Sequence, residues 1–217
     1  MGCCGASYTI IGESADIKGV FYEDDILPFL EKSKESTCKI SNEISYGSGF
    51  FCRIPYTENE NSYINVLLTC EHVLTKDIVL SNDKDIDILI NNQPKIITLK
   101  KTRKKWSNPE LDYSCIEIKE EDNIDNDFYQ LDDIFLKKDY NKEEFLKDNY
   151  NDIIIFATMA INKRGFDSGN IIKFQGDNFV HNCNTYYGCS GGVIVNKKKY
   201  SHWNAYRSIQ KQHKSNC

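Results

Sequence analysis

Several features that would place this chain in a specialised class are scarce or missing. No Asn-x-Ser/Thr sequon occurs although asparagine is abundant, and the opening residues MGCCGASYTI lack the basic and apolar stretches of a secretory signal. No apolar run approaches the roughly 18 residues that a membrane-spanning helix needs. No C-x-x-C or H-x-x-x-H pair indicates a metal site. We therefore expect a cytoplasmic globular protein without a metal or cofactor.

Charge and cysteine content narrow the class further. The net charge is −5, and the densest basic cluster, Lys101–Lys105, is typical of a solvated loop rather than a nucleic-acid patch. The nine cysteines leave at least one thiol unpaired, so we expect them to be reduced. A chain of 217 residues, 40% of them apolar, is long enough for one large or two small domains. We expect no nucleic-acid partner, because no long basic stretch occurs.

The amino terminus carries a candidate lipid-attachment sequence. Gly2 is the acceptor position for myristate once the methionine is removed, and Cys3 and Cys4 are placed for palmitate. Two acyl chains anchor a protein stably where one does not. The usual Ser or Thr at the sixth position is Ala6, so a free terminus is the alternative. Acylation would tether the chain to the cytoplasmic face of a membrane.

Short apolar runs predict a chain made mostly of β-strands. A helix is predicted at Asp24–Glu31, a hairpin turn at Ser168–Asn170, an acidic connection within Lys119–Asn151, and a strand or terminal helix near Trp203–Ile209. Because no βαβ alternation occurs, an all-β barrel or sandwich is favoured. The predicted strands are Ser7–Ile11, Ile17–Tyr22, Gly49–Ile54, Tyr63–Thr69, Asp85–Ile90, Lys95–Leu99, Tyr113–Ile118, Ile153–Thr158, Ile171–Phe174, Phe179–Cys183 and Val193–Val195.

Three short segments carry the residue types of nucleophilic hydrolysis. His72 stands in LLTCEHVL, Asp112 in PELDYSCIEI and Ser190 in YGCSGG. A serine that attacks a carbonyl must lose its proton to a base, and histidine suits because its pKa lies near neutrality. A carboxylate then holds the imidazole in the required tautomer. Glycines around a serine indicate a backbone that bends tightly or approaches another group closely.

Each of the three residues also has a purely structural interpretation. Ser190 could lie at a hairpin tip, His72 in a turn or core, and Asp112 at a strand entrance, since Asp85 and Asp87 also precede apolar runs between His72 and Ser190. The pattern G-C-S-G-G also fits the G-x-S-x-G elbow of α/β-hydrolases. That fold places the acid of its triad after the serine, and no Asp or Glu follows Ser190.

Four segments together resemble the trypsin/chymotrypsin-like serine peptidase superfamily. Residues 69–73 (TCEHV) resemble its T-A-x-H, residues 112–116 (DYSCI) its D-x-A-x-x, residues 188–192 (GCSGG) its G-D-S-G-G, and residues 47–50 its G-S-G-F strand. Their order along the chain is that of the superfamily.

The resemblance implies an all-β fold of two six-stranded antiparallel β-barrels. Residues 1–44 would form an amino-terminal extension and residues 45–217 the peptidase domain, with the first barrel at about 45–120 and the second at about 150–217. The polar tail after Val195 predicts that the second barrel is incomplete at its carboxyl end.

The resemblance also implies a serine endopeptidase that acts on proteins or peptides through an acyl-enzyme. Ser190 would be the nucleophile, His72 the base and Asp112 its orienting acid, while the backbone N–H groups of Gly188 and Ser190 would form the oxyanion hole. The alternative is a catalytically inactive binding module of the same fold, tethered at a membrane.

The sequence departs from the superfamily pattern near the serine. Cys189 replaces the aspartate of G-D-S-G-G, which implies activity without zymogen cleavage; its thiol could also be a nucleophile or a redox-sensitive group. Asn184 falls at the expected base of the substrate pocket, so a basic preference is not supported. Thr185 resembles the threonine of glutamate-specific relatives, with His202 as a candidate partner. His181 and His202 are otherwise expected to be structural or on the surface.

Overall fold

The computed structural model describes residues 23–41, 46–55, 63–124, 128–131, 152–158, 163–175, 178–196 and 204–206. The strands predicted at Ser7–Ile11 and Ile17–Tyr22 lie outside these residues, as do the acylation candidates Gly2, Cys3 and Cys4. Within the described ranges, no helix combines the length and the apolar character needed to cross a membrane.

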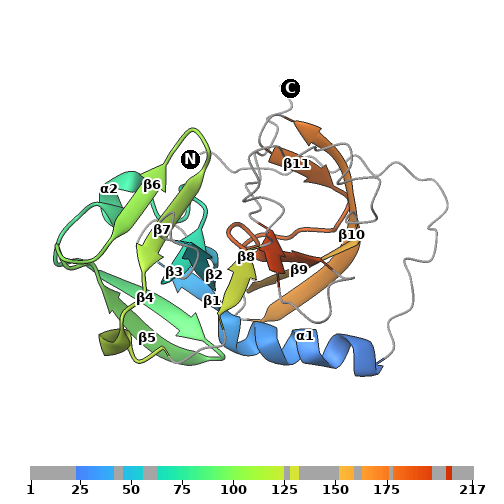
Figure 1. Ribbon diagram of the computed structural model, residues 1–217, viewed down its shortest axis with the longest axis horizontal. Coiled ribbons are helices and arrows are strands. Elements are labelled where there is room, and N and C mark those ends of the chain that lie inside the picture. The colour runs from blue at the N-terminus through green and yellow to red at the C-terminus, as the bar shows by residue number, and fades with distance from the viewer. Residues whose placement is uncertain are drawn as a thin grey trace.

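The first part of the chain folds into an antiparallel barrel (Figure 1). Its strands follow the order β6-β7-β3-β2-β1-β4-β5. Two of them, β1 and β6, were not predicted; the other strands match predicted ones to within a few residues. The bounds are β1 Thr37–Ser41, β2 Tyr46–Pro55, β3 Tyr63–Thr69, α2 Lys76–Val79, β4 Asp85–Ile90, β5 Gln93–Thr98, β6 Lys105–Asn108, β7 Tyr113–Glu117 and η1 Glu120–Asp122.

The second part of the chain forms a second barrel-like sheet in the order β11-β10-β9-β12-β13-β8. Strand β8 pairs in parallel with both β13 and β2 and so joins the two halves. The all-β fold with two β-barrels is therefore confirmed. Residues 197–203 and 207–217 lie outside the described ranges, so incompleteness at the carboxyl end stays a prediction. The bounds are β8 Tyr129–Leu131, β9 Asp152–Thr158, β10 Arg164–Gln175, β11 Asn178–His181, β12 Val193–Asn196 and β13 Asn204–Tyr206.

The predicted hairpin turn at Ser168–Asn170 is wrong, because β10 runs through it. Strand β10 pairs with β9 as far as Asn170 and with β11 from Ile171 onward, so it passes from one sheet to the other at this point. A Cβ at Gly169 would lie 2.3 Å from the side-chain oxygen of Asn182. The glycine therefore permits a close approach inside a bent strand and does not mark a chain reversal.

Two hydrophobic clusters lie on opposite faces of β2 and β3. Phe51 and Leu67 face the interior of the first barrel, whereas Phe50 and Val66 belong to a cluster that includes residues of β9 and β12. Successive strand residues point to opposite faces, so both faces of these strands are buried, which explains their continuous apolar runs. Burial on both faces also fixes the register of the strands that carry the candidate site.

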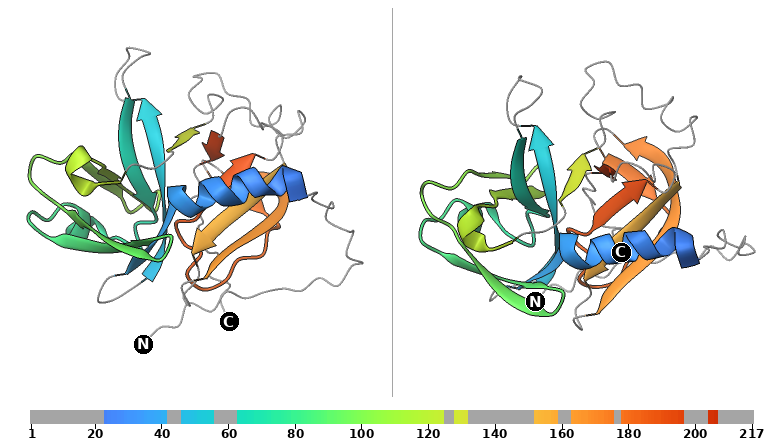
Figure 2. Two further views of the ribbon diagram at one scale, coloured as in Figure 1. Left: turned by 90° about the horizontal axis from the view of Figure 1, so that it is seen from below. Right: turned by 60° about the horizontal axis from the view of Figure 1, so that its bottom comes forward.

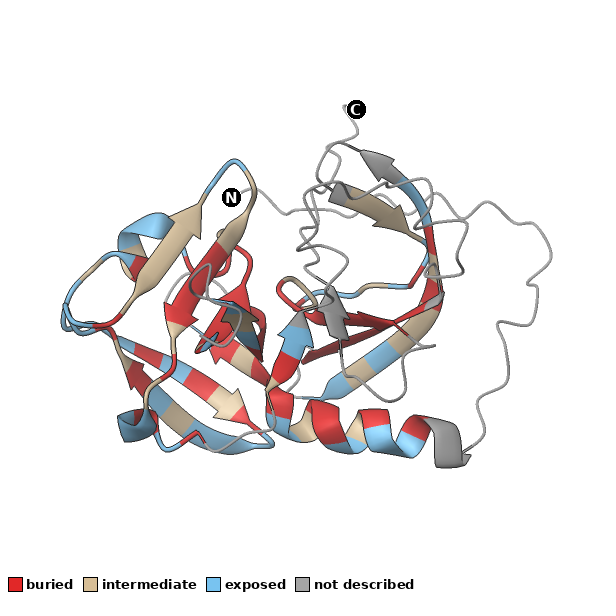
Figure 3. Ribbon diagram, viewed as in Figure 1, coloured by how far each residue is buried: buried red, intermediate tan, exposed pale blue. Residues whose placement is uncertain are grey.

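Helix α1 (Glu23–Ser36) lies against both halves of the molecule (Figures 2 and 3). Ile26 and Phe29 belong to the cluster that β2 and β3 share with β9 and β12. Burying a side chain of this size contributes roughly 1.5–3 kcal/mol. The helix predicted at Asp24–Glu31 is confirmed and extends to the start of β1. Its buried residues lie on one face of the helix and, apart from the adjacent Lys32 and Ser33, recur three or four positions apart: Ile26, Phe29, Lys32, Ser33 and Ser36.

The basic cluster Lys101–Lys105 was predicted to be a solvated loop, but one of its residues, Arg103, is buried. The Arg103 side chain is buried and donates two hydrogen bonds to the Asp122 carboxylate, at 2.6 and 2.8 Å, and a third to the Glu117 carbonyl. A buried charge needs such a partner. Arg103 therefore fixes η1 against the end of β7.

Candidate active site

Strands β3 and β7 bring His72 and Asp112 together. The two strands are antiparallel with Thr69 opposite Ser114, so the segment that follows β3 and the segment that precedes β7 lie at one end of the ladder. Asp112 adopts a φ of 50°, in the left-handed region that Asp tolerates better than most residues. Strand register thus makes neighbours of two residues that are distant in sequence.

The two side chains form a close pair. Nδ1 of His72 lies 2.8 Å from Oδ2 and 3.0 Å from Oδ1 of Asp112, and the His72 backbone N–H donates to Oδ1 at 3.1 Å. The hydrogen bond to Asp112 raises the pKa of His72 above 6.5, against a smaller lowering by burial. Because Nδ1–H donates to the carboxylate, Nε2 is left to accept a proton. Solvent reaches 47% of the His72 side chain, so a substrate can reach it too.

A third titratable residue, Cys70, is buried beside this pair. Its sulfur and the ligand atoms of His72 and Asp112 lie within 4.8 Å of one another, a spacing at which they could hold a metal ion. Burial and, to a smaller extent, the Asp112 charge raise the pKa of the Cys70 thiol to about 12, although a backbone hydrogen bond from Gly191 opposes them. A metal would bind this sulfur as the thiolate, so its binding would release the thiol proton.

Ser190 lies in a tight loop between β11 and β12. Gly188 and Gly191 have φ values of 95° and 83°, a region that glycine enters without steric cost. A Cβ at Gly191 would also lie 2.0 Å from the carbonyl oxygen of Ser48. The backbone conformation therefore favours glycine at both positions, and at Gly191 the close approach of Ser48 requires it as well.

Ser48 of β2 fastens this loop to the first barrel. Its N–H donates to the Ser190 carbonyl at 2.7 Å, and its hydroxyl donates to the Gly188 carbonyl at 2.8 Å and accepts from the Thr158 N–H at 2.8 Å. The Ser48 carbonyl accepts from the Thr69 hydroxyl at 2.7 Å. One fully buried residue thus connects the loop, the end of β9 and the end of β3.

The backbone N–H groups of Gly188 and Ser190 have no acceptor among the described residues. Gly188 is buried, and buried N–H groups are rarely left without a partner. By contrast, the N–H groups of Cys189 and Gly192 donate within the loop, at 3.0 and 2.9 Å. The N–H groups of Gly188 and Ser190, one on each side of Cys189, could therefore both donate to an oxyanion.

The Ser190 loop and the His72 segment meet, but the two side chains are not joined. A Cβ at Gly47 would lie 2.5 Å from Val73 and 2.9 Å from the Ser190 carbonyl oxygen, so both segments border this glycine. In the described part of the chain, neither the Ser190 hydroxyl nor Nε2 of His72 forms a hydrogen bond. Catalytic hydrogen bonds are often long before substrate binds.

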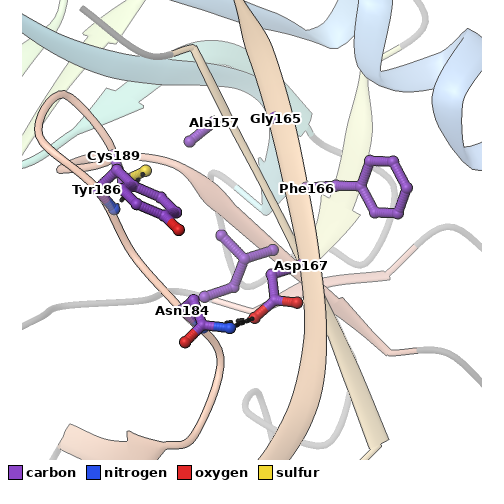
Figure 4. A pocket seen from close by; sticks show the side chains of 8 residues that line it. Ala157, Gly165, Phe166, Asp167, Asn184, Tyr186 and Cys189 are labelled. Atoms are coloured by element: carbon purple, nitrogen blue, oxygen red, sulfur yellow. Dashed lines mark hydrogen bonds between the residues drawn. The ribbon is translucent and has the colours of Figure 1, made fainter. Parts of the chain in front are cut away.

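A cavity of about 200 Å³ lies beside the Ser190 loop (Figure 4). Asn184, predicted at the base of the pocket, lines it, whereas Thr185 does not. Asp167 also lines it and was not predicted, because it belongs to β10 and no short motif marks it. The lining residues are Ile155, Ala157, Gly165, Phe166, Asp167, Asn184, Tyr186 and Cys189.

Cys189 forms part of the cavity wall. The Tyr186 N–H donates to its sulfur at 3.3 Å, and burial raises the pKa of the Cys189 thiol above its ordinary value. The thiolate is the nucleophilic form of cysteine, so a raised pKa makes a poor nucleophile at neutral pH. These contacts favour a packing role for Cys189 over a nucleophilic one.

Solved structures share this fold. The Rv3671c protease of M. tuberculosis, in its inactive form, has a TM-score of 0.53 at 13% identity over 82% of this chain and 80% of that one. The serine endoprotease from Yersinia pestis gives 0.52 at 13% over 82% and 54%, and Deg5 gives 0.54 at 14% over 83% and 82%. No family model and no curated protein matches the sequence. The chain therefore has the fold of the trypsin-like serine proteases, as the four motifs predicted.

Proposed function

We propose that the protein is a serine endopeptidase. The observation that carries the proposal is the His72–Asp112 pair, held at the end of β3 beside a glycine-rich loop that contains Ser190. A serine hydroxyl becomes a nucleophile when a base oriented in this way takes its proton. Proteases among the solved structures of this fold support the same activity.

The proposed reaction proceeds through an acyl-enzyme. Ser190 Oγ attacks the carbonyl carbon of a peptide while Nε2 of His72 takes its proton, and Asp112 stabilises the imidazolium. The N–H groups of Gly188 and Ser190 donate to the oxyanion; one such donor is worth on the order of 10² to 10³ in rate. The C–N bond then breaks as His72 protonates the leaving amine. Water, deprotonated by the same nitrogen, releases the acid and restores Ser190.

The second candidate is an inactive binding module of the same fold. The observation that favours it is the missing hydrogen bond between His72 and Ser190 among the described residues. Such a module would bind a peptide in the same cleft without cleaving it. Hydrolysis therefore separates the two candidates.

Hydrolysis of fluorescently labelled casein tests the proposal. We expect the purified chain to release peptides, and Ser190→Ala and His72→Ala each to lower the rate by on the order of 10⁴-fold or more. Ser81→Ala is the matched control, because the Ser81 hydroxyl donates to the nearby Ile78 carbonyl and, among the described residues, to no other group. Undiminished hydrolysis by Ser190→Ala contradicts the proposal, and a folded but inactive wild-type chain favours the binding module.

A further inference from the structure

Cys70, His72 and Asp112 bring three kinds of metal-ligand atom together beyond the end of β3. The Cys70 sulfur, a ring nitrogen of His72 and a carboxylate oxygen of Asp112 all lie within 4.8 Å of one another, and His72 Nδ1 is 2.8 Å from Asp112 Oδ2. Bonds from zinc to such atoms are about 2.0–2.3 Å long, so the ligand atoms of a tetrahedral site lie roughly 3–4 Å apart. A small contraction of the cluster therefore gives the spacing that a zinc ion requires.

The cluster has a closed side and an open side. Cys70 is 2% exposed and belongs to the core of the first barrel, whereas the side chains of Asp112 and His72 are 17% and 47% exposed. An ion can therefore enter past His72 and meet the sulfur at the floor of the site. Three protein ligands leave a fourth position for water, as in open zinc sites.

The ligand types and their charges favour zinc. Ca²⁺ and Mg²⁺ prefer oxygen ligands, whereas zinc binds sulfur, nitrogen and oxygen alike. Cys70 binds a metal as the thiolate, so Cys70 and Asp112 together contribute two negative charges, which a divalent ion neutralises. The carboxylate of Glu71, the residue between two of the ligands, adds to the negative potential at His72.

We propose that Cys70, His72 and Asp112 bind a zinc ion and that the bound ion holds the peptidase inactive. The second part rests on the proposed function, whereas the binding itself does not require catalysis. The ligands come from two segments that the pairing of β3 with β7 brings together. No C-x-x-C or H-x-x-x-H pair therefore marks the site in the sequence, from which no metal was expected.

The bound ion deprives Ser190 of its base. Nδ1 of His72, the nitrogen that faces Asp112, binds the ion through its lone pair and so carries no proton. The proton of the neutral imidazole then lies on Nε2, and the thiol proton of Cys70 passes to solvent. A protonated Nε2 cannot accept the proton of the serine. Inhibition therefore follows from the tautomer that the ion imposes on His72.

Titration of the full chain with Co²⁺, followed by absorbance, tests the binding. Cobalt occupies zinc sites and gives a charge-transfer band in the near ultraviolet when a thiolate binds it. The chain carries Cys3→Ser and Cys4→Ser, because two adjacent thiols could bind the probe themselves. We expect a band that saturates at one cobalt per chain and that zinc abolishes by displacement.

Two cysteine variants assign the band. Cys70→Ala should abolish it, whereas Cys38→Ala, which removes another fully buried thiol, should preserve it. Absence of the band, its persistence in Cys70→Ala, or its equal loss in Cys38→Ala overturns the inference.

His72→Ala decides the matter if Cys70→Ala fails to fold, because the His72 side chain is half exposed. We expect this variant to bind cobalt at least about 10- to 100-fold more weakly, since even the partner of a metal ligand is worth that factor. An unchanged affinity overturns the inference.

Casein hydrolysis separates the inference from the proposed function. We expect zinc to inhibit hydrolysis and a chelator to restore it, and inhibition of Cys70→Ala to need roughly 100-fold more zinc. Cys70-dependent cobalt binding in a chain that never hydrolyses casein supports the metal site and refutes the peptidase. Hydrolysis by a chain without such binding supports the peptidase and refutes the metal site. Cys70-dependent binding that leaves hydrolysis undiminished refutes the inhibitory role.

Discussion

The protonation state of His72 decides whether Ser190 can be activated. Only the neutral imidazole can accept the serine proton, and the hydrogen bond from Nδ1 to Asp112 raises the pKa of His72 above 6.5. The neutral fraction therefore grows as the pH rises through this raised pKa. On the proposed mechanism, kcat/KM follows the same rise.

Replacing Asp112 by asparagine should change both the rate and its pH dependence. We expect Asp112→Asn to lower kcat by about 10⁴-fold, because the orienting charge is lost. The ascending limb of the residual activity should move to lower pH, since Asp112 is the largest cause of the raised pKa. Peptide hydrolysis measured between about pH 5 and 9, where histidine titrates, checks both effects.

Asp87→Asn is the control for this profile, because it removes a carboxylate that lies away from His72 on β4. An Asp112→Asn profile that coincides with that of wild type would show that Asp112 does not orient the base.

At the residue scale, the residues that the sequence predicted for the candidate site stand in short motifs. His72, Asp112 and Ser190 each follow or precede an apolar strand with a recognisable pattern. Asp167 has no such signal, because only the pairing of β10 with β9 places it beside Ile155 in the lining of the cavity. The sequence indicated Ser48 only as part of the G-S-G-F motif. Its hydrogen bond to the Ser190 loop could not be predicted, because it depends on how the two barrels meet.

At the scale of elements, β2 is the strand that connects the two halves of the site. Its residue Ser48 bonds the carbonyls of Gly188 and Ser190, and these peptide units adjoin the two N–H donors assigned to the oxyanion. The loop therefore takes its orientation from the first barrel, although its sequence belongs to the second. We assign Ser48 a positioning role on this basis.

Ser48→Ala should lower kcat more than it changes KM. The substitution removes the donor to Gly188 and the acceptor for the Thr158 N–H, so the loop loses its anchor. We expect kcat to fall by roughly 10- to 100-fold, because a small misplacement of a reacting group slows a reaction by about this factor. The free energy of unfolding should fall by about 1–3 kcal/mol. Steady-state kinetics and denaturant unfolding measure the two effects.

The control for Ser48→Ala is Ser36→Ala, a serine equally buried on α1. It should cost stability without lowering kcat. If both variants lose kcat in proportion to stability, Ser48 acts only through the fold.

The strands that the sequence predicted are the apolar ones. Strands β1 (TCKIS) and β6 (KWSN) were missed because they are short and largely polar. They become strands by pairing, β1 between β2 and β4 and β6 along β7. The error at Ser168–Asn170 has a related cause: turn-forming residues also serve where a strand bends between two sheets.

At the scale of the whole molecule, the site lies where two barrels meet. His72 and Asp112 come from the first barrel, whereas Ser190 and the cavity come from the second. One hydrophobic cluster, to which α1 contributes, packs residues of both barrels together. The proposed chemistry thus depends on tertiary packing, because neither barrel contains a complete set of groups.

Fluorophosphonate labelling of the full chain, followed by mass spectrometry of the adduct, tests the assembled site most directly. The reagent reacts with a serine only when a base activates it, so labelling requires the two barrels to place Ser190 and His72 together. We expect a single adduct on Ser190 that is absent from Ser190→Ala and His72→Ala and unchanged in Ser81→Ala. A folded wild-type chain that takes no label, or a label that persists in Ser190→Ala, would contradict the proposed peptidase.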